Sequence, residues 1–267
     1  MDFASPRDLD EALAAKAAAP DAVFLAGGTD LMVGVNLAHY RPMSVIGLRH
    51  VEETRGIGAD RIGAGVTWAR LEKHSHRALA QLARTVGSPQ IRAAGTIGGN
   101  IGTASPAGDG LPWIAVLDAG IELVSSDRGK RVVPWKDFFV GVKRTSIADD
   151  ELITGVVLPD EVPKIQEFAK IGVRNAMVIS TVCCVVMRFD AGFRIALGSS
   201  APTPIRAIKA EEMLNSESSP SDAAITEFGR LVSLEVRPIT DHRSTEAYRR
   251  HAAGVLAQRL VRRCLAA

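Results

Sequence analysis

Two glycine-rich stretches constrain the fold of this chain more than any other feature of its sequence. Gly27-Gly28 follow the apolar run 23–26 and precede a helical pattern at residues 31–37, which gives a strand, a glycine turn and a helix in succession. Gly98-Gly99 lie within residues 95–110, a glycine-rich stretch that is too long for an idle connection in a compact domain. We therefore expect residues 95–110 to form a functional loop.

Paired glycines are suited to binding phosphate, because the main chain without a Cβ approaches a ligand closely and adopts positive φ. Neither pair is part of a dinucleotide fingerprint: residues 63–68 come nearest, but Trp68 stands where the third glycine belongs. Taken alone, each pair is better explained as a tight turn. Two such loops in one domain, with hydroxyl and carboxamide residues attached, favour a diphosphate ligand; those residues are Thr29, Thr96, Asn100 and Thr103.

Helix and strand patterns alternate through the first part of the chain, beginning with a helix that Ser5 is predicted to cap, with Pro6 as its first residue. A charged, proline-marked stretch at residues 159–164 indicates a domain boundary. Beyond it, strand patterns predict an antiparallel meander, and three helical patterns finish the chain. The expected fold is α+β, with one domain at residues 1–160 and a second, of small antiparallel sheet and helices, at residues 161–267.

Charge and hydropathy exclude several classes of partner. Lys and Arg number 32 against 30 Asp and Glu, so no net field is present to hold nucleic acid or an anionic membrane. The longest uncharged apolar run, residues 177–187, is about half of the roughly 20 residues that a membrane-spanning helix needs. The N-terminus has no basic and apolar signal region, so we expect a cytoplasmic protein.

The cysteines and histidines predict no metal site on this chain. Cys183 and Cys184 are neighbours, which in a strand point to opposite faces, and Cys264 belongs to a terminal helical pattern, so all three are expected to be buried thiols. No CxxC motif is present, which argues against zinc or an iron–sulfur cluster. His74 and His76 are expected to be solvated residues.

At the level of motifs, residues 26–31 (AGGTDL) and 96–101 (TIGGNI) resemble the paired FAD loops of the molybdenum hydroxylase flavoproteins. The resemblance continues through residues 103–106 (TASP), Asp109 and Pro112, and residues 201–206 (APTPIR) are similar to the FAD subunit of bacterial xanthine dehydrogenases. It covers essentially the whole chain. It implies a two-part FAD domain of the type shared with p-cresol methylhydroxylase, followed by the C-terminal domain of these flavoproteins.

The resemblance also implies which residues bind FAD. The two loops would bracket the pyrophosphate, with Thr103 close by; the residues concerned are Leu25, Ala26, Gly27, Gly28, Thr29, Asp30, Leu31, Thr96, Ile97, Gly98, Gly99, Asn100 and Thr103. Fixed N–H dipoles stabilise phosphate charge without lysine, which agrees with the lack of a basic cluster at either loop.

Four further positions correspond to FAD-contacting residues of the family: Asp109, Ile153, Lys170 and Ile179. Without the resemblance, Asp109 would be interpreted as a turn residue, Lys170 as a solvated strand residue and Ile179 as core. A lysine near the isoalloxazine could stabilise the charge of reduced flavin. Val86 stands where animal xanthine dehydrogenases have a phenylalanine, a departure from the family pattern.

By this resemblance the chain is an oxidoreductase component, the FAD-carrying medium subunit of a xanthine dehydrogenase-like enzyme. Its expected partners are a small [2Fe-2S] subunit and a large molybdopterin subunit, with electrons leaving through FAD to NAD+ or another acceptor. The alternative hypotheses are a stand-alone flavin-binding module without redox partners and a structural protein with degenerate loops. The substrate is undetermined, because another subunit would bind it.

Overall fold

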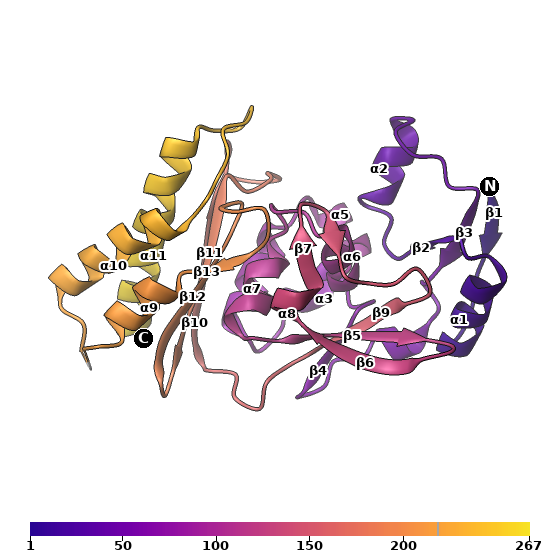
Figure 1. Cartoon of the computed structure of the whole chain (residues 1–267), viewed down its shortest axis with the longest axis horizontal. Helices are drawn as coiled ribbons and strands as arrows, with labels where there is room; N and C mark the ends of the chain where they lie inside the picture. Colours follow the sequence, from indigo (N-terminus) through magenta and orange to yellow (C-terminus); the bar gives the residue numbers. More distant parts are fainter. Residues whose placement is uncertain (218) are drawn as a thin grey trace.

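The N-terminal segment forms a small parallel sheet with two helices. Its elements are β1 (Asp2–Ala4), α1 (Leu9–Ala18), β2 (Val23–Leu25), α2 (Leu31–Asn36) and β3 (Ser44–Gly47). This computed structural model describes residues 1–217 and 219–267 of the chain (Figure 1). The strands lie in the order β1-β3-β2 and pair in parallel, so their carboxyl ends share one edge of the sheet. The first glycine turn follows β2 at that edge.

Helix α1 begins later than its sequence pattern predicts. Asp8 is the N-cap, and its side chain accepts a hydrogen bond from the Glu11 N–H at 2.8 Å, so the predicted cap at Ser5 is wrong. The reason is local: the Asp8 side chain caps the Glu11 N–H, and the Glu11 carboxylate in turn accepts from the Arg7 N–H at 2.8 Å, which fixes the start of the helix at this point.

The middle of the chain folds into a four-stranded antiparallel sheet surrounded by short helices. The sheet has the order β4-β9-β5-β6. Its strands are β4 (Arg61–Gly63), β5 (Gly120–Ser125), β6 (Gly129–Pro134) and β9 (Leu152–Val157). The helices are η1 (Glu52–Thr54), α3 (Trp68–Leu71), α4 (Arg77–Thr85), α5 (Pro89–Ala94), α6 (Ile97–Thr103), α7 (Gly110–Val116) and α8 (Trp135–Phe138), and β7 (Phe139–Gly141) and β8 (Arg144–Thr145) form a separate ribbon. The expectation of one long loop at residues 95–110 is thus wrong, because α6 occupies residues 97–103 and α7 begins at Gly110.

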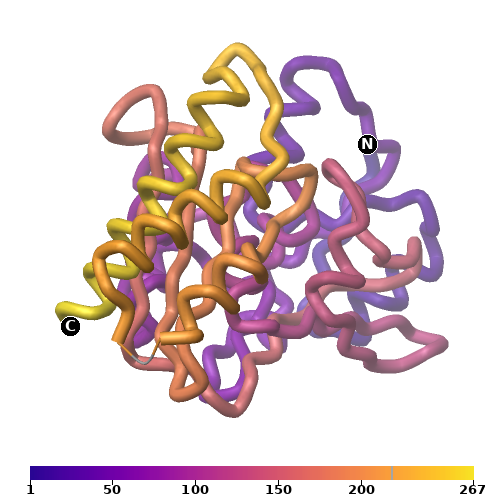
Figure 2. Tube along the Cα trace, turned by 60° about the vertical axis from the view of Figure 1, so that its left-hand side comes forward, coloured from indigo at the N-terminus to yellow at the C-terminus, as the bar shows by residue number. Residues whose placement is uncertain are grey.

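The C-terminal segment is an antiparallel sheet covered on one face by helices. The sheet has the order β10-β11-β12-β13. It consists of β10 (Ile165–Ile171), β11 (Val182–Phe189), β12 (Gly192–Gly198) and β13 (Ile205–Arg206), and the helices are α9 (Ile208–Leu214), α10 (Asp222–Glu235) and α11 (Glu246–Leu265). Figure 2 shows these helices, in orange and yellow, lying together over the sheet. No helix in the described ranges has the length and apolarity that crossing a membrane requires.

This C-terminal sheet buries both of its faces, and β11 shows it most clearly. Cys183 belongs to the core shared with the middle of the chain, whereas Cys184 belongs to the core under α10 and α11. The prediction that the two thiols point to opposite faces is confirmed, as is the burial of Cys264. Burial on both faces also explains why β11 carries no charge from Val182 to Met187.

Helix α4 connects the middle and C-terminal segments through polar contacts with the edge strand β10. The Gln81 side-chain oxygen accepts a hydrogen bond from the Phe168 N–H at 2.7 Å, and the Ala78 N–H donates to Gln166 at 3.3 Å. The first bond satisfies a backbone group of the edge strand, and the second satisfies a free N–H group in the first turn of α4. The two segments are therefore joined by directional contacts as well as by apolar packing.

Candidate functional site

The first glycine turn is held tightly against the second glycine-rich segment. Gly28 has a φ of +70°, a conformation that side chains with a Cβ rarely adopt. A Cβ on Gly27 would lie 1.9 Å from the Ala94 carbonyl oxygen and 2.9 Å from the Gly95 Cα. Glycine is therefore required at position 27 for the close approach of two backbone segments, and at position 28 for its dihedral angle.

The same turn presents a series of free backbone donors. Within residues 1–217 and 219–267, the N–H groups of residues 27–31 have no protein acceptor, and the first donor that is paired in α2 is Met32, to Gly28 O at 3.0 Å. Asp30 is the N-cap residue of α2 but makes no side-chain capping bond. Consecutive unpaired N–H groups at the carboxyl end of a parallel strand form an anion-binding arrangement. This turn can hold phosphate oxygens.

The second glycine segment is organised differently, because its own N–H groups are occupied. Thr96 caps α6, and its Oγ1 accepts a hydrogen bond from the Gly99 N–H at 3.0 Å. The Ile97 and Gly98 N–H groups donate to carbonyl oxygens of residues 66 and 64, at 3.0 and 2.8 Å, and the Asn100 N–H donates to Thr96 O. This segment therefore contributes surface and side chains, while the first turn contributes the backbone donors.

Two glycines of α6 have opposite surroundings. A Cβ on Gly98 would lie 2.5 Å from the Ala64 Cβ, so Gly98 is packed inside the protein. Gly99 is exposed, and a Cβ there would meet only the Thr96 Oγ1, at 3.2 Å. Gly99 is thus the position at which a ligand can approach the helix backbone.

Side chains connect the two glycine segments at their rims. The Thr103 hydroxyl donates to Asp30 Oδ2 at 3.4 Å, which joins the end of α6 to the start of α2. The Asn100 Oδ1 accepts from the Gly110 N–H at 3.2 Å, which fixes the amide and leaves its NH2 group as a donor. The structure therefore brings together the residues that the sequence assigned to the two loops.

Asp109 and Lys170 form a buried ion pair between the middle and C-terminal segments. Lys170 Nζ lies 2.7 Å from Asp109 Oδ2, and the two side chains are 9% and 7% exposed. Lys170 is therefore not the solvated residue that its strand pattern alone suggests. The second carboxylate oxygen of Asp109 accepts from the Ser180 hydroxyl at 2.5 Å. Sequence reasoning missed Ser180, although a polar residue inside the apolar run 177–187 was a signal for it.

The two isoleucines of the expected site have different environments. Ile153 is 8% exposed, and its Cδ1 lies 3.5 Å from the position that a Cβ on Gly102 would take. Ile179 is 53% exposed, so the interpretation of this residue as core is wrong. Val86, at the end of α4, packs partly buried against the main core.

His74 and His76 differ from their expected solvated state. Their ring centroids are 4.4 Å apart, and His74 Nδ1 accepts from the His76 N–H at 3.1 Å. Burial, together with the neighbouring His74, lowers the pKa of His76 to about 4, so this imidazole is neutral at pH 7. Both side chains are half-buried, and the His76 ring lies 6.1 Å from that of the buried Trp113.

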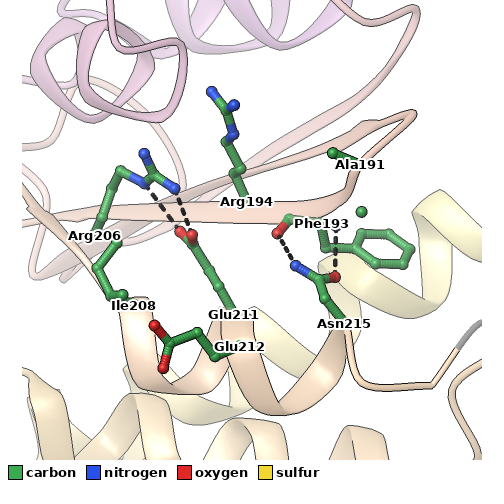
Figure 3. Close-up of a pocket in the computed structure, with 9 residues that line it drawn as sticks. Ala191, Phe193, Arg194, Arg206, Ile208, Glu211, Glu212 and Asn215 are labelled. Carbon is green, nitrogen blue, oxygen red and sulfur yellow. Dashed lines mark hydrogen bonds and ion pairs between the residues drawn. The ribbon is translucent and has the colours of Figure 1, made fainter.

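Cavities lie on both the N-terminal and the C-terminal segments. One of about 530 Å³ is lined by Ser5, Arg7 and His50, residues that follow β1 and β3 at the sheet edge shared with the first glycine turn. Another, of about 350 Å³, lies beside β12 and α9 (Figure 3). There the Arg206 guanidinium is paired with Glu211, at 2.5 Å, and with Asp118, at 2.6 Å, so its charge is compensated within the protein.

Comparisons with known proteins agree with this geometry. The family model described as "FAD binding domain in molybdopterin dehydrogenase" matches residues 1–161, and that described as "CO dehydrogenase flavoprotein C-terminal domain" matches residues 167–264. A putative xanthine dehydrogenase FAD-binding subunit of Escherichia coli K12 is 31% identical over 100% of this chain and 98% of its own length. A nicotinate dehydrogenase FAD-subunit of Eubacterium barkeri is 36% identical over 80% of this chain and 79% of its own.

A solved structure shares the whole fold. A chain of carbon monoxide dehydrogenase from Hydrogenophaga pseudoflava superposes with a TM-score of 0.90 at 27% identity, over 100% of this chain and 97% of that one. The free N–H groups of the first glycine turn and the open backbone at Gly99 fit a cofactor with a pyrophosphate. The chain belongs to the FAD-binding medium subunits of the molybdenum hydroxylases, so it is an oxidoreductase subunit whose cofactor is FAD.

Proposed function

We propose that this chain carries electrons from [2Fe-2S] clusters on a small partner subunit, through FAD, to NAD+ or another acceptor in the cytoplasm. A large molybdopterin subunit would oxidise the substrate and supply the electrons. The observation that carries the proposal is the series of N–H groups at residues 27–31 without an acceptor in the described part of the chain, on a turn that Thr103 joins to the α6 segment carrying the exposed Gly99. FAD, when bound, can accept electrons and exchange hydride with a nicotinamide.

In this proposal the two glycine segments contact the pyrophosphate in different ways. The N–H groups of residues 27–31 donate to phosphate oxygens, since they have no acceptor within the described part of the protein. Gly99 leaves room for the ligand, and the free NH2 group of Asn100 adds a donor. The Thr103–Asp30 hydrogen bond connects the two segments directly.

The isoalloxazine would lie toward the boundary of the middle and C-terminal segments. Ile153 and Ile179 offer apolar contacts there, and the Asp109–Lys170 pair supplies charge. All three donors of the Lys170 ammonium are engaged, with Asp109 and with the carbonyl oxygens of Thr85 and Val178. Lys170 therefore acts on the flavin through its electric field and not through a direct hydrogen bond.

Partner subunits follow from the reaction and from the relatives. Several relatives are named as subunits or medium chains of dehydrogenases, and this chain covers nearly all of their length. The three cysteines of the sequence are buried in apolar surroundings, which does not provide the thiolate set of an iron–sulfur cluster. The clusters would therefore be held by another chain.

Reconstitution tests the binding part of this proposal. We expect the purified apo chain to bind one FAD noncovalently, with a flavin absorption spectrum that survives gel filtration and is released by denaturation. A chain that remains folded by circular dichroism but colourless after incubation with excess FAD would contradict the proposal.

Purification from the native source tests the electron-transfer part. We expect copurification with one iron–sulfur chain and one molybdenum chain; a chain that carries FAD but purifies alone would favour the stand-alone flavin module. The isolated FAD-loaded chain, freed of molybdenum, should not hydroxylate xanthine or other heterocycles, but should reduce dyes with NADH if NAD+ is the acceptor. Hydroxylation by the molybdenum-free chain would refute its role as an electron-exit subunit.

A further inference from the structure

A chain of hydrogen bonds holds the Asp109 carboxylate from the side opposite to Lys170. The Ser180 hydroxyl donates to Asp109 Oδ1 at 2.5 Å, and the Ser180 carbonyl oxygen accepts from the Ser199 hydroxyl at 2.8 Å. Arg249 closes the chain by donating to the Thr181 and Ser199 carbonyl oxygens, at 2.5 and 3.3 Å. These side chains are at least nine-tenths buried, so the geometry is screened from water.

Ser199 lies in a conformation that serine rarely adopts. Its φ is +57°, in the left-handed region, although it is not a glycine. With this backbone its N–H donates to the Pro106 carbonyl oxygen at 2.7 Å, three residues before Asp109. Strained residues persist where the surroundings fix them, and they gather at functional sites. Ser199 thus contacts both the segment that carries Asp109 and the residue that binds its carboxylate.

The placement of Asp109 decides how much positive charge Lys170 presents. The ion pair is only 2.7 Å long, so at a distance the carboxylate cancels much of the field of the ammonium. Burial raises the pKa of the nearby Cys183 thiol well above its usual value, so that thiol stays neutral and does not alter the balance. Any movement of the carboxylate away from Lys170 would make the site more positive.

We propose that Ser180 and Ser199 are positioning residues that hold the Asp109 carboxylate against Lys170 and thereby set the reduction potential of the bound flavin. The inference rests on the proposed function, in particular on the flavin lying within reach of the Lys170 field. Without the Ser180 hydroxyl, the buried Oδ1 loses the donor that fixes it, so the carboxylate can turn away from Lys170 and then offsets the ammonium less completely. Reduced flavin carries more negative charge than oxidised flavin, so its binding is then favoured.

The test is the midpoint potential of FAD bound to the full chain, measured by spectroelectrochemistry. Ser180→Ala should raise it, corresponding to about a tenfold increase in affinity for reduced over oxidised FAD, or about 30 mV for a two-electron couple. Ser199→Gly keeps the backbone donor and suits the positive φ, so it should fold and should raise the potential in the same direction by a smaller factor of about three. If Ser180→Ala does not fold, Ser199→Gly decides the question.

Ser200→Ala is the matched control, because Ser200 is equally buried but its hydroxyl donates to Gly198 O and does not reach Asp109. The control should keep the wild-type potential. A potential that is unchanged or lowered in the folded Ser180 or Ser199 variant, or an equal shift in the Ser200 variant, would overturn the inference. Failure of the wild-type chain to bind FAD would instead refute the proposed function.

Discussion

Adding a methyl group at Gly99 should weaken FAD binding much more than it changes the stability of the apo protein. Gly99 lies in the first turn of α6, where alanine is favoured over glycine by about 0.5–1 kcal/mol. The new Cβ would lie 3.2 Å from the Thr96 Oγ1, a slightly tight contact that offsets part of this gain. The free energy of unfolding of apo Gly99→Ala should therefore lie within about 1 kcal/mol of that of the wild type.

The same methyl group occupies space that we assign to the pyrophosphate. Inserting a methylene into a closely fitted contact costs about 1–3 kcal/mol, which is roughly a 5- to 150-fold weaker affinity for FAD. Gly99→Val, with two more carbons, should weaken binding further. Gly98→Ala gives the contrasting result, because its Cβ would lie 2.5 Å from the Ala64 Cβ and should destabilise the apo fold itself.

Two measurements decide between these outcomes: quenching of FAD fluorescence on titration with apo protein, and urea unfolding of the same apo protein. Gly34→Ala is the matched control, since Gly34 also lies in a short helix and a Cβ there would meet only the Tyr40 Cβ, at 3.8 Å. If Gly99→Val binds FAD within twofold of wild type, or loses as much apo stability as it loses binding energy, Gly99 is a structural turn and the loop assignment is wrong.

Three further predictions concern stability and are checked by urea unfolding of the apo chain. Asp109→Ala leaves Lys170 buried without its partner and should cost about 3–5 kcal/mol, whereas the apolar double substitution, Asp109→Leu with Lys170→Met, should recover most of it; a loss below about 1 kcal/mol would mean that the pair is hydrated. Gly27→Ala should cost about 1–3 kcal/mol, because its Cβ would overlap the Ala94 carbonyl, and a neutral result would show that the two backbone segments can separate freely. Burial alone would raise the pKa of Glu122, but hydrogen bonds from two basic side chains and a threonine lower this pKa to about 2. The ionised carboxylate therefore stabilises the fold above the pKa that it has in the unfolded chain, and this stabilisation is lost as the pH falls toward 2. The stability difference between wild type and Glu122→Gln should therefore shrink by roughly 2 kcal/mol from pH 6 to pH 3, and a constant difference would refute the lowered pKa.

Local sequence patterns predicted best those elements whose formation depends on residues close in the chain. The strand, glycine turn and helix at residues 23–37 were predictable, because alternation, positive φ and helical spacing each depend on residues close in the chain. The cap of α1 was missed although its signal is local, because Asp8 and Glu11 have the spacing of a reciprocal capping pair.

The sequence by itself determined the family and the cofactor and located the two glycine segments, because positive φ and close backbone approach require glycine at particular positions. Tertiary structure decided which backbone N–H groups of these segments are bonded within the protein and which are left for a ligand. Only the fold shows that the first N–H groups of α6 are bonded, to the Thr96 hydroxyl and to the carbonyl oxygens of residues 64 and 66. The N–H groups of residues 27–31, in contrast, have no acceptor in the described part of the chain. Likewise, Lys170 and Asp109 are 61 positions apart, and only the packing of β10 against α4 and of β11 against α7 brings opposite charges together and out of water. Hydrogen-bond satisfaction and desolvation depend on neighbours distant in the chain, so a linear pattern does not contain them.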